Sequence, residues 1–97
     1  MLCCTKIFIL VTPIFKVDED VVNTEGHVLE DYREVMRNVQ KKYQFKLIEM
    51  AYCGINEFNA ATTIPDGTHP TLEVGGKLVA KRFINEFKEI SKVLTEI

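Results

Sequence analysis

The chain has no long apolar run and no large excess of charge of either sign. Its longest apolar run, Ile7 to Val11, is far too short to cross a membrane. The 97 residues carry 12 Lys and Arg against 14 Asp and Glu, and a net charge of −2 gives no electrostatic footprint for nucleic acid. We therefore expect neither a membrane nor a nucleic acid as a partner. A chain of this length predicts one small domain, residues 1–97.

The N-terminus lacks the features of a signal peptide, and cysteine is scarce. Met1–Lys6 has no basic region, and no small-residue cleavage site follows it. The three cysteines are Cys3, Cys4 and Cys53, and an odd number with two adjacent is a poor disulfide framework. Both features favour a cytoplasmic protein whose thiols stay reduced.

The order of the apolar patterns predicts an α/β domain. The stretch Thr5–Thr12, which contains the apolar run Ile7 to Val11, is typical of a strand buried on both faces. Glu25–Tyr43 carries apolar residues at helical spacings of three and four. A second strand over Phe45–Ala51 completes a βαβ unit, whose two strands should be parallel. A short helix near Asn56–Ala61 and a longer helix over Phe83–Glu96 follow.

A hairpin is expected between the last two helices. Apolar and polar residues alternate over Thr71–Val74, and Gly75 and Gly76 can supply the positive φ angles of a two-residue turn. The returning strand would cover Lys77–Lys81. The resulting sheet has four strands, with Ile7, Ile9 and Val11 of its central strand buried.

This order, β-α-β-(α)-β-β-α, resembles the thioredoxin and glutaredoxin superfamily. The segments that carry the resemblance are Thr68-His69-Pro70-Thr71-Leu72 and Gly75-Gly76-Lys77-Leu78-Val79. The resemblance implies a thioredoxin-like three-layer α/β sandwich around a four-stranded mixed sheet, with a cis bond before Pro70. A ferredoxin-like α+β sandwich is the alternative, because it shares the βαβ unit and a hairpin.

The chain departs from that family at its active site. Redox-active members carry cysteine at the start of the first helix, where the helix end lowers the pKa of the thiol. The matching region here, from Thr12 through His27, contains neither cysteine nor serine. We therefore expect a redox-inactive, protein-binding module with no cofactor, which associates with a protein partner or forms a homodimer.

The expected binding edge combines the loop around Pro70 with the loop after the first strand. In the family, the residue before the cis-proline offers its backbone to an extended substrate. Three interpretations of His69 stay open: a residue of the binding edge, a residue that transfers protons, or an exposed side chain of the loop. No Ser-His-Asp arrangement can be recognised from spacing alone. The residues of this edge are Thr68, His69, Pro70, Pro13, Ile14 and Phe15, with Phe58 as a further apolar contact.

An atypical thiol-disulfide oxidoreductase that uses Cys53, or the Cys3-Cys4 pair, is the alternative function. Cys53 would be reactive if exposed beside a cation, and inert if buried. Cys4 begins the first strand and Cys53 follows the second. In parallel strands the start of one and the end of the other lie well beyond the ~7 Å Cα separation that a disulfide can bridge. We therefore expect no disulfide between Cys53 and either Cys3 or Cys4.

The acidic cluster Asp18-Glu19-Asp20 is the remaining candidate for a metal site. Three consecutive carboxylates cannot all turn toward one ion without help, so we interpret the cluster as a solvated loop and expect no metal. A cation site is the alternative.

Overall fold

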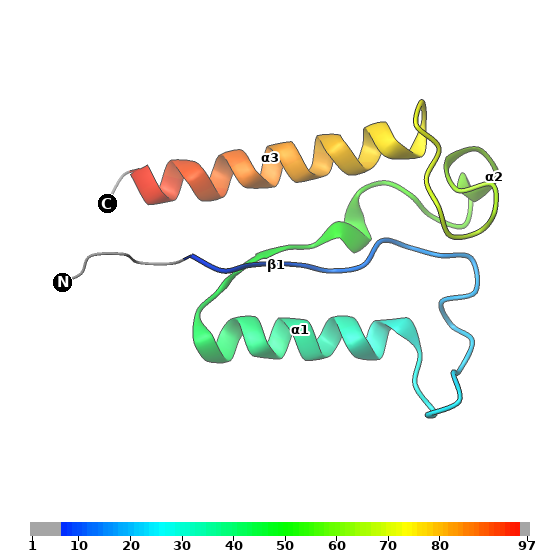
Figure 1. The fold of residues 1–97 in the computed structure, drawn as a ribbon, viewed down its shortest axis with the longest axis horizontal. Coiled ribbons are helices and arrows are strands. Elements are labelled where there is room, and N and C mark those ends of the chain that lie inside the picture. The colour runs from blue at the N-terminus through cyan, green and yellow to red at the C-terminus, as the bar shows by residue number, and fades with distance from the viewer. Residues whose placement is uncertain (1–6, 96–97) are drawn as a thin grey trace.

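A computed structural model describes residues 7–95, and the side chains of residues 7–93. Within residues 7–95 the chain forms two short strands, three α-helices and one 3-10 helix (Figure 1). The elements in chain order are β1 (Ile9–Val11), α1 (Leu29–Tyr43), β2 (Lys46–Ile48), the 3-10 helix η1 (Met50–Tyr52), α2 (Ala60–Thr63) and α3 (Gly75–Thr95).

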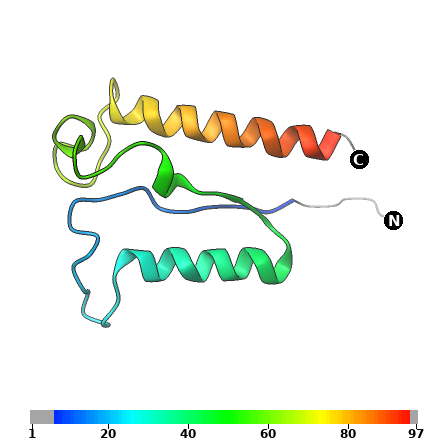
Figure 2. The ribbon, with the colours of Figure 1, turned by 180° about the vertical axis from the view of Figure 1, so that it is seen from behind.

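The elements form three layers. β1 and β2 are parallel, with Ile9 opposite Lys46 and Val11 opposite Ile48, as the βαβ pattern predicts. The strand layer lies between α1 and α3, and both helices contact β2 (Figures 1 and 2). The molecule extends over 49 × 34 × 17 Å. Its thin dimension follows from the narrow sheet, because neighbouring strands lie only about 4.8 Å apart.

The prediction of a four-stranded thioredoxin-like sheet is wrong. Thr71–Val74 lies in the turn that leads into α3, and Lys77–Lys81 lies inside α3. The described residues thus form a sheet of two strands, which fits neither the thioredoxin-like nor the ferredoxin-like fold. The predicted cis bond is also wrong, because no peptide bond in the described part of the chain is cis, including that before Pro70.

The two glycines serve close packing and not a hairpin turn. A Cβ added at Gly75 would overlap the carbonyl oxygen of Thr63 and lie 2.9 Å from Cβ of Pro70. A Cβ on Gly76 would lie 2.9 Å from the carbonyl oxygen of Thr71. The start of α3 is therefore pressed against the backbone of α2 and of the loop between the helices.

Strand β1 is far more exposed than its sequence predicts. Val11 is 40% exposed and Ile9 is half-buried, and Ile7, two residues before the strand, is 49% exposed. β1 has one neighbouring strand among the described residues, so its second edge is open. The core instead lies beside β2 and α3, and it consists of Ile48, Met50, Cys53, Ile55, Ala60 and Ile64.

Helix α1 begins later than predicted but ends at Tyr43 as predicted. The side-chain oxygen Oδ1 of Asn23 accepts the backbone N–H groups of Glu25 and His27, both at 3.0 Å. This local turn replaces the first turn of the expected helix, as Asn side chains commonly do. No helix within residues 7–95 is both long and apolar enough to cross a membrane.

Replacing Gly75 with Ala tests the close packing of α3. Helix propensity alone predicts that Gly75→Ala stabilises the protein by about 1 kcal/mol. We expect the opposite, a loss of about 1–3 kcal/mol in the free energy of unfolding, because the new methyl group overlaps the Thr63 carbonyl. Urea unfolding measures the change, and Ala80→Gly in the same helix is the control, with an expected loss of about 1 kcal/mol from propensity. A stabilised Gly75→Ala variant would contradict this packing.

Candidate functional site

The loop between α2 and α3 lies beyond the carboxyl ends of both strands (Figure 1). In open α/β sheets, ligands bind at this end of the strands. The loop that follows β1 reaches the same place, because the backbone N–H of Val17 donates to the carbonyl of Gly67 at 2.9 Å. Two segments far apart in the sequence are thus joined beside Asp66.

Asp66 and His69 form a hydrogen-bonded pair in this loop. Oδ1 of Asp66 accepts the backbone N–H of Thr68 at 2.8 Å and that of His69 at 2.6 Å. Oδ2 of Asp66 lies 2.7 Å from Nδ1 of the His69 ring. Both carboxylate oxygens are therefore engaged, and the imidazole is held by one of its two nitrogens.

The charge on Asp66 determines the tautomer of His69. The backbone N–H groups of His69 and Thr68, followed by the His69 ring, lower the pKa of Asp66 from 3.8 to about 2. The carboxylate is thus ionised at neutral pH and can only accept hydrogen bonds, so the proton of neutral His69 must sit on Nδ1. Nε2 then keeps its lone pair, on a side chain that is 81% exposed.

A tight turn places the carboxylate. Gly67 has a φ of +86°, and its N–H donates to the carbonyl of Ile64 at 2.7 Å. Pro65 precedes Asp66, and proline and glycine at these places are typical of turns. Asp66 therefore projects from a short connection whose backbone is fixed at both ends.

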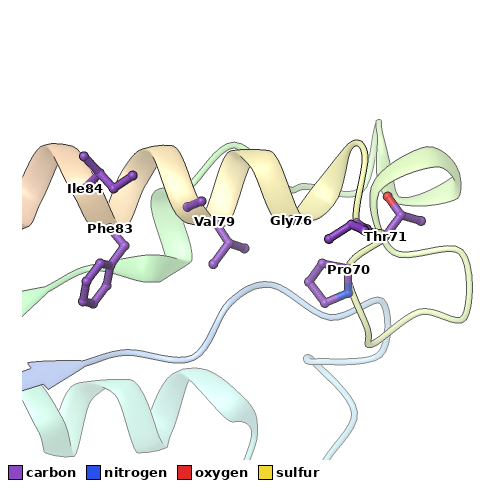
Figure 3. Close-up of a pocket in the computed structure, with 8 residues that line it drawn as sticks. Pro70, Thr71, Gly76, Val79, Phe83 and Ile84 are labelled. Atoms are coloured by element: carbon purple, nitrogen blue, oxygen red, sulfur yellow. The ribbon is translucent and has the colours of Figure 1, made fainter.

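An apolar groove begins next to the pair. It has a volume of about 550 Å³ and runs from the loop along α3 (Figure 3). Val79 and Phe83 point from α3 toward the strand layer in this view. The residues that line the groove are Pro70, Thr71, Leu72, Gly76, Val79, Ala80, Phe83 and Ile84.

A buried arginine holds the loop after β1. Arg33 of α1 is 2% exposed. It donates from Nε to the carbonyl of Pro13 at 3.0 Å and from Nη2 to the carbonyl of Ile14 at 2.8 Å. It also reaches both carboxylate oxygens of Glu19, each at 3.0 Å. One guanidinium thus fixes the two ends of the segment that contains Val17.

The charge of Arg33 is secured by its partners. Burial by itself lowers the pKa of Arg33, but the hydrogen bonds and charges of Glu19 and Glu30 outweigh burial and leave the pKa raised. Glu19 is itself 15% exposed on its side chain. The group is a paired, hydrogen-bonded buried charge, the form in which buried charges are tolerated.

A second polar cluster joins α1 to the end of β2. Arg37 donates hydrogen bonds to Glu49, Glu30 and Glu34. These bonds raise the pKa of Arg37, and the bond to Glu49 has the largest effect. The same bond from Arg37 lowers the pKa of Glu49. Glu49 also accepts the hydroxyl of Thr12 at 3.0 Å. Because every member has a partner, we interpret this cluster as structural.

The residues predicted for the binding edge fall into two groups. Thr68, His69 and Pro70 are exposed and adjacent to the groove. Pro13, Ile14 and Phe15 are half-buried instead of forming an exposed apolar contact. The carbonyls of Pro13 and Ile14 bind Arg33, and the side chains of Ile14 and Phe15 pack against the core. The remaining residue, Phe58, is 90% exposed.

The cysteines provide no exposed thiol in the described part of the chain. Cys53 is 8% exposed, is a free thiol and belongs to the core. Such a thiol behaves as a small apolar side chain. Cys3 and Cys4 lie outside the described residues, so the expected separation of Cys4 from Cys53 stays a prediction.

The acidic cluster is divided. Asp18 and Asp20 are exposed, whereas Glu19 turns inward to Arg33. Within residues 7–95, no group of three His, Cys, Asp or Glu side chains could hold a metal ion.

The role of Asp66 is not evident from the sequence alone. The available signal was an acid three residues before a histidine, in a turn marked by Pro65 and Gly67. Such spacing by itself does not show that the two side chains meet.

A comparison of the chain with protein-family models, with curated proteins and with solved structures finds no match.

A carboxyl-carbon NMR titration tests the Asp66–His69 pair. We expect Asp66 to be half protonated near pH 2, below its ordinary 3.8. Since its pKa is lower in the folded state, the pair contributes stability above about pH 4 that is lost as the pH falls toward 2. Nitrogen-15 spectra should place the proton of neutral His69 on Nδ1. An ordinary Asp66 titration, or a proton on Nε2, would contradict the pair.

Replacing Arg33 with Met tests the clamp on the loop after β1. Arg33→Met leaves Glu19 and two carbonyls without their partner, so we expect the free energy of unfolding to fall by about 3 kcal/mol. Arg82→Met is the matched control, because the Arg82 side chain is 29% exposed and makes one ion pair with Glu86 and one hydrogen bond to the carbonyl of Glu49, so we expect a loss of only about 1–2 kcal/mol. Urea unfolding compares the two variants. Equal losses of unfolding free energy in the two variants would contradict this structural role of Arg33.

Proposed function

We propose that this chain carries the acid–base pair of a hydrolytic site, Asp66 and His69, and that a group outside residues 7–93 supplies the nucleophile. The observation that supports this function is the 2.7 Å contact between Oδ2 of Asp66 and Nδ1 of His69. In hydrolases with a Ser-His-Asp triad, the carboxylate holds the imidazole in this way and leaves Nε2 free to accept a proton.

The pair would act in two steps. Nε2 of His69 accepts the proton of a hydroxyl or thiol while that group attacks the carbonyl carbon of an ester or amide. The ionised Asp66 stabilises the imidazolium that forms. The imidazolium then returns the proton to the leaving group, so His69 and Asp66 end unchanged. A water molecule releases the acyl group by the same two proton transfers.

The arrangement of residues 7–93 favours a nucleophile from outside these residues. Within residues 7–93, no hydroxyl or thiol is hydrogen-bonded to the ring of His69. The one serine of the chain, Ser91, lies sixteen residues after Gly75 in α3, about 24 Å along the helix. Cys53 is buried in the core. The hydroxyl of Thr63 donates to the carbonyl of Asn59 at 2.9 Å.

A protein partner is one source of that nucleophile and remains part of the proposal, whereas the thioredoxin-like fold does not. The buried Cys53 gives no support to a thiol oxidoreductase. Its free thiol fits a reducing compartment, so the cytoplasm is the compartment that we propose.

Hydrolysis of 4-nitrophenyl acetate by the chain alone tests the activation of His69. An exposed imidazole attacks this ester through its free nitrogen, expels 4-nitrophenolate, and is regenerated when water hydrolyses the acyl-imidazole. We expect the wild type to exceed both His69→Gln and Asp66→Asn by about threefold or more, because the carboxylate orients and activates the ring.

His27 provides a matched control for this assay. Its ring Nδ1 lies 3.7 Å from Oδ2 of Asp31, too far for a hydrogen bond, and its side chain is 54% exposed. His27→Gln should leave most of the rate. If His69→Gln and His27→Gln reduce the rate equally, His69 has no special activation and the proposed function is wrong.

A further inference from the structure

The apolar groove beside His69 is bounded by the loop that enters α3 and by one face of α3 itself (Figure 3). The loop contributes Pro70, Thr71 and Leu72. The helix contributes residues at spacings of three and four, which share one face of α3. They are Gly76, Val79, Ala80, Phe83 and Ile84. Because Pro70 follows His69 directly in the chain, the groove begins at the acid–base pair.

The polar groups at the start of the groove are already hydrogen-bonded. Thr71 has the one polar side chain among the lining residues. Its Oγ1 accepts the N–H of Val74 at 3.2 Å and that of Gly75 at 3.1 Å, and it donates to the carbonyl of Thr62 at 3.5 Å. The N–H of Gly76 donates to the carbonyl of Thr71 at 2.6 Å. The lining therefore offers a ligand apolar contact and no charged partner.

The groove has a supported wall and an exposed apolar lining. Val79 is half-buried and packs against the core. Phe83 is 40% exposed and Ile84 is 51% exposed, so much of the apolar lining remains in contact with water. A ligand that covers these side chains removes apolar surface from water on both sides, which favours binding.

The dimensions of the groove fit a small ligand. Its volume of about 550 Å³ lies within the range of about 300–1,000 Å³ that is usual for small-molecule sites. Gly76 and Ile84 lie eight residues apart in α3, about 12 Å along the helix. A carbon–carbon bond of about 1.5 Å advances an extended alkyl chain by roughly 1.25 Å, so about eight to ten carbons span this length.

A polypeptide segment fits the groove less well than an alkyl chain. A helix about 10 Å across occupies roughly 900 Å³ over the same 12 Å, so the groove could take only part of it. An extended peptide needs partners for its own N–H and C=O groups, whereas the wall formed by α3 has its backbone groups engaged within the helix. An alkyl chain has no polar group and needs no such partner.

We propose that the groove binds the aliphatic chain of a fatty acyl ester or amide and that the carbonyl group of this substrate lies beside His69. The reaction at the carbonyl rests on the proposed function, whereas the binding of the chain rests on the groove alone. A chain that lies along α3 and against Pro70 ends next to His69, because these two residues are consecutive. The groove thus selects the acyl group, and the acid–base pair acts where the chain ends.

Titration with aliphatic amides, followed by NMR, tests the binding of the chain apart from any reaction. Octanamide has the acyl end of such a substrate, and amides resist direct attack by an imidazole. We expect its addition to shift the signals of Val79, Phe83 and Ile84. A fully buried methylene group strengthens binding about fourfold, and in an open groove we expect about twofold. Octanamide should therefore bind about tenfold or more tightly than butanamide.

Two variants of α3 form a matched pair for this titration. Ile84→Asn places an amide in the lining and should weaken octanamide binding about threefold or more. Val93→Asn makes a similar change on the same helix outside the lining, where Val93 is 48% exposed, and should bind octanamide as the wild type does. Equal binding of butanamide and octanamide, or equal weakening in the two variants, would overturn the proposal.

Filling the groove tests whether a second copy of this chain covers it instead. Ala80 is exposed and lines the groove, so the larger ring in Ala80→Trp takes up part of its volume. We expect this variant to lose the octanamide-induced shifts, and urea unfolding checks that it is folded. If it does not fold, Ile84→Asn and Val93→Asn decide the matter. A wild-type dimer in light scattering that becomes monomeric in Ala80→Trp would overturn the proposal in favour of a second copy.

The 4-nitrophenyl esters of acetic, butyric and hexanoic acid test whether a bound chain places its carbonyl at His69. The quantity compared is the second-order rate constant of the wild type minus that of His69→Gln. We expect this difference to rise about tenfold from acetate to hexanoate, which adds four methylene groups, and to rise less in Ile84→Asn. A His69-dependent rate that does not rise with chain length would overturn the placement of the carbonyl.

The two assays separate this inference from the proposed function. A His69-dependent rate on acetate supports the proposed function without the groove, because acetate carries a single methyl group. If that rate is absent while octanamide still binds more tightly than butanamide, the hydrolytic role is wrong and the groove is supported as a site for an aliphatic chain. If the rate is present and the amides bind equally, the proposed function stands and the assignment of the groove is wrong.

Discussion

The buried guanidinium of Arg33 is the interaction on which the rest of the structure depends. It binds two carbonyls directly after β1 and the carboxylate of Glu19, and so ties the loop after β1 to α1. That loop in turn contacts Gly67, next to Asp66. Because a buried charge without partners is very costly, the loop cannot leave Arg33 without a large loss of stability. The site is supported by the same contacts that hold the layers together.

The contact between Asp66 and His69 is formed by local hydrogen bonds and needs few contacts from the rest of the fold. Three hydrogen bonds within four residues fix the carboxylate and the ring. What the fold contributes is the location, at the carboxyl end of two parallel strands and at the start of an apolar groove. The hydrogen-bonded pair Asp66–His69 thus lies at the end of the sheet where α/β proteins bind ligands.

The thin shape of the molecule explains why so many apolar residues are exposed. A sheet of only two strands is too narrow to cover the inner sides of both helices. The two helices in turn leave some side chains of the strands exposed. Phe8 and Val11 of the strand layer, and Phe83 and Phe87 of α3, therefore remain partly exposed.

The sequence by itself determined the parallel βαβ unit, the end of the first helix at Tyr43, and a helix over most of residues 83–96, because long apolar patterns report which side of an element is buried. Tertiary structure alone decided the stretch from Thr71 to Lys81. Four alternating residues and two glycines fit a hairpin locally, but the approach of Gly75 to the Thr63 carbonyl makes them the start of α3. It also decided that Asp66 and His69 meet, because their contact depends on a turn geometry that spacing does not encode.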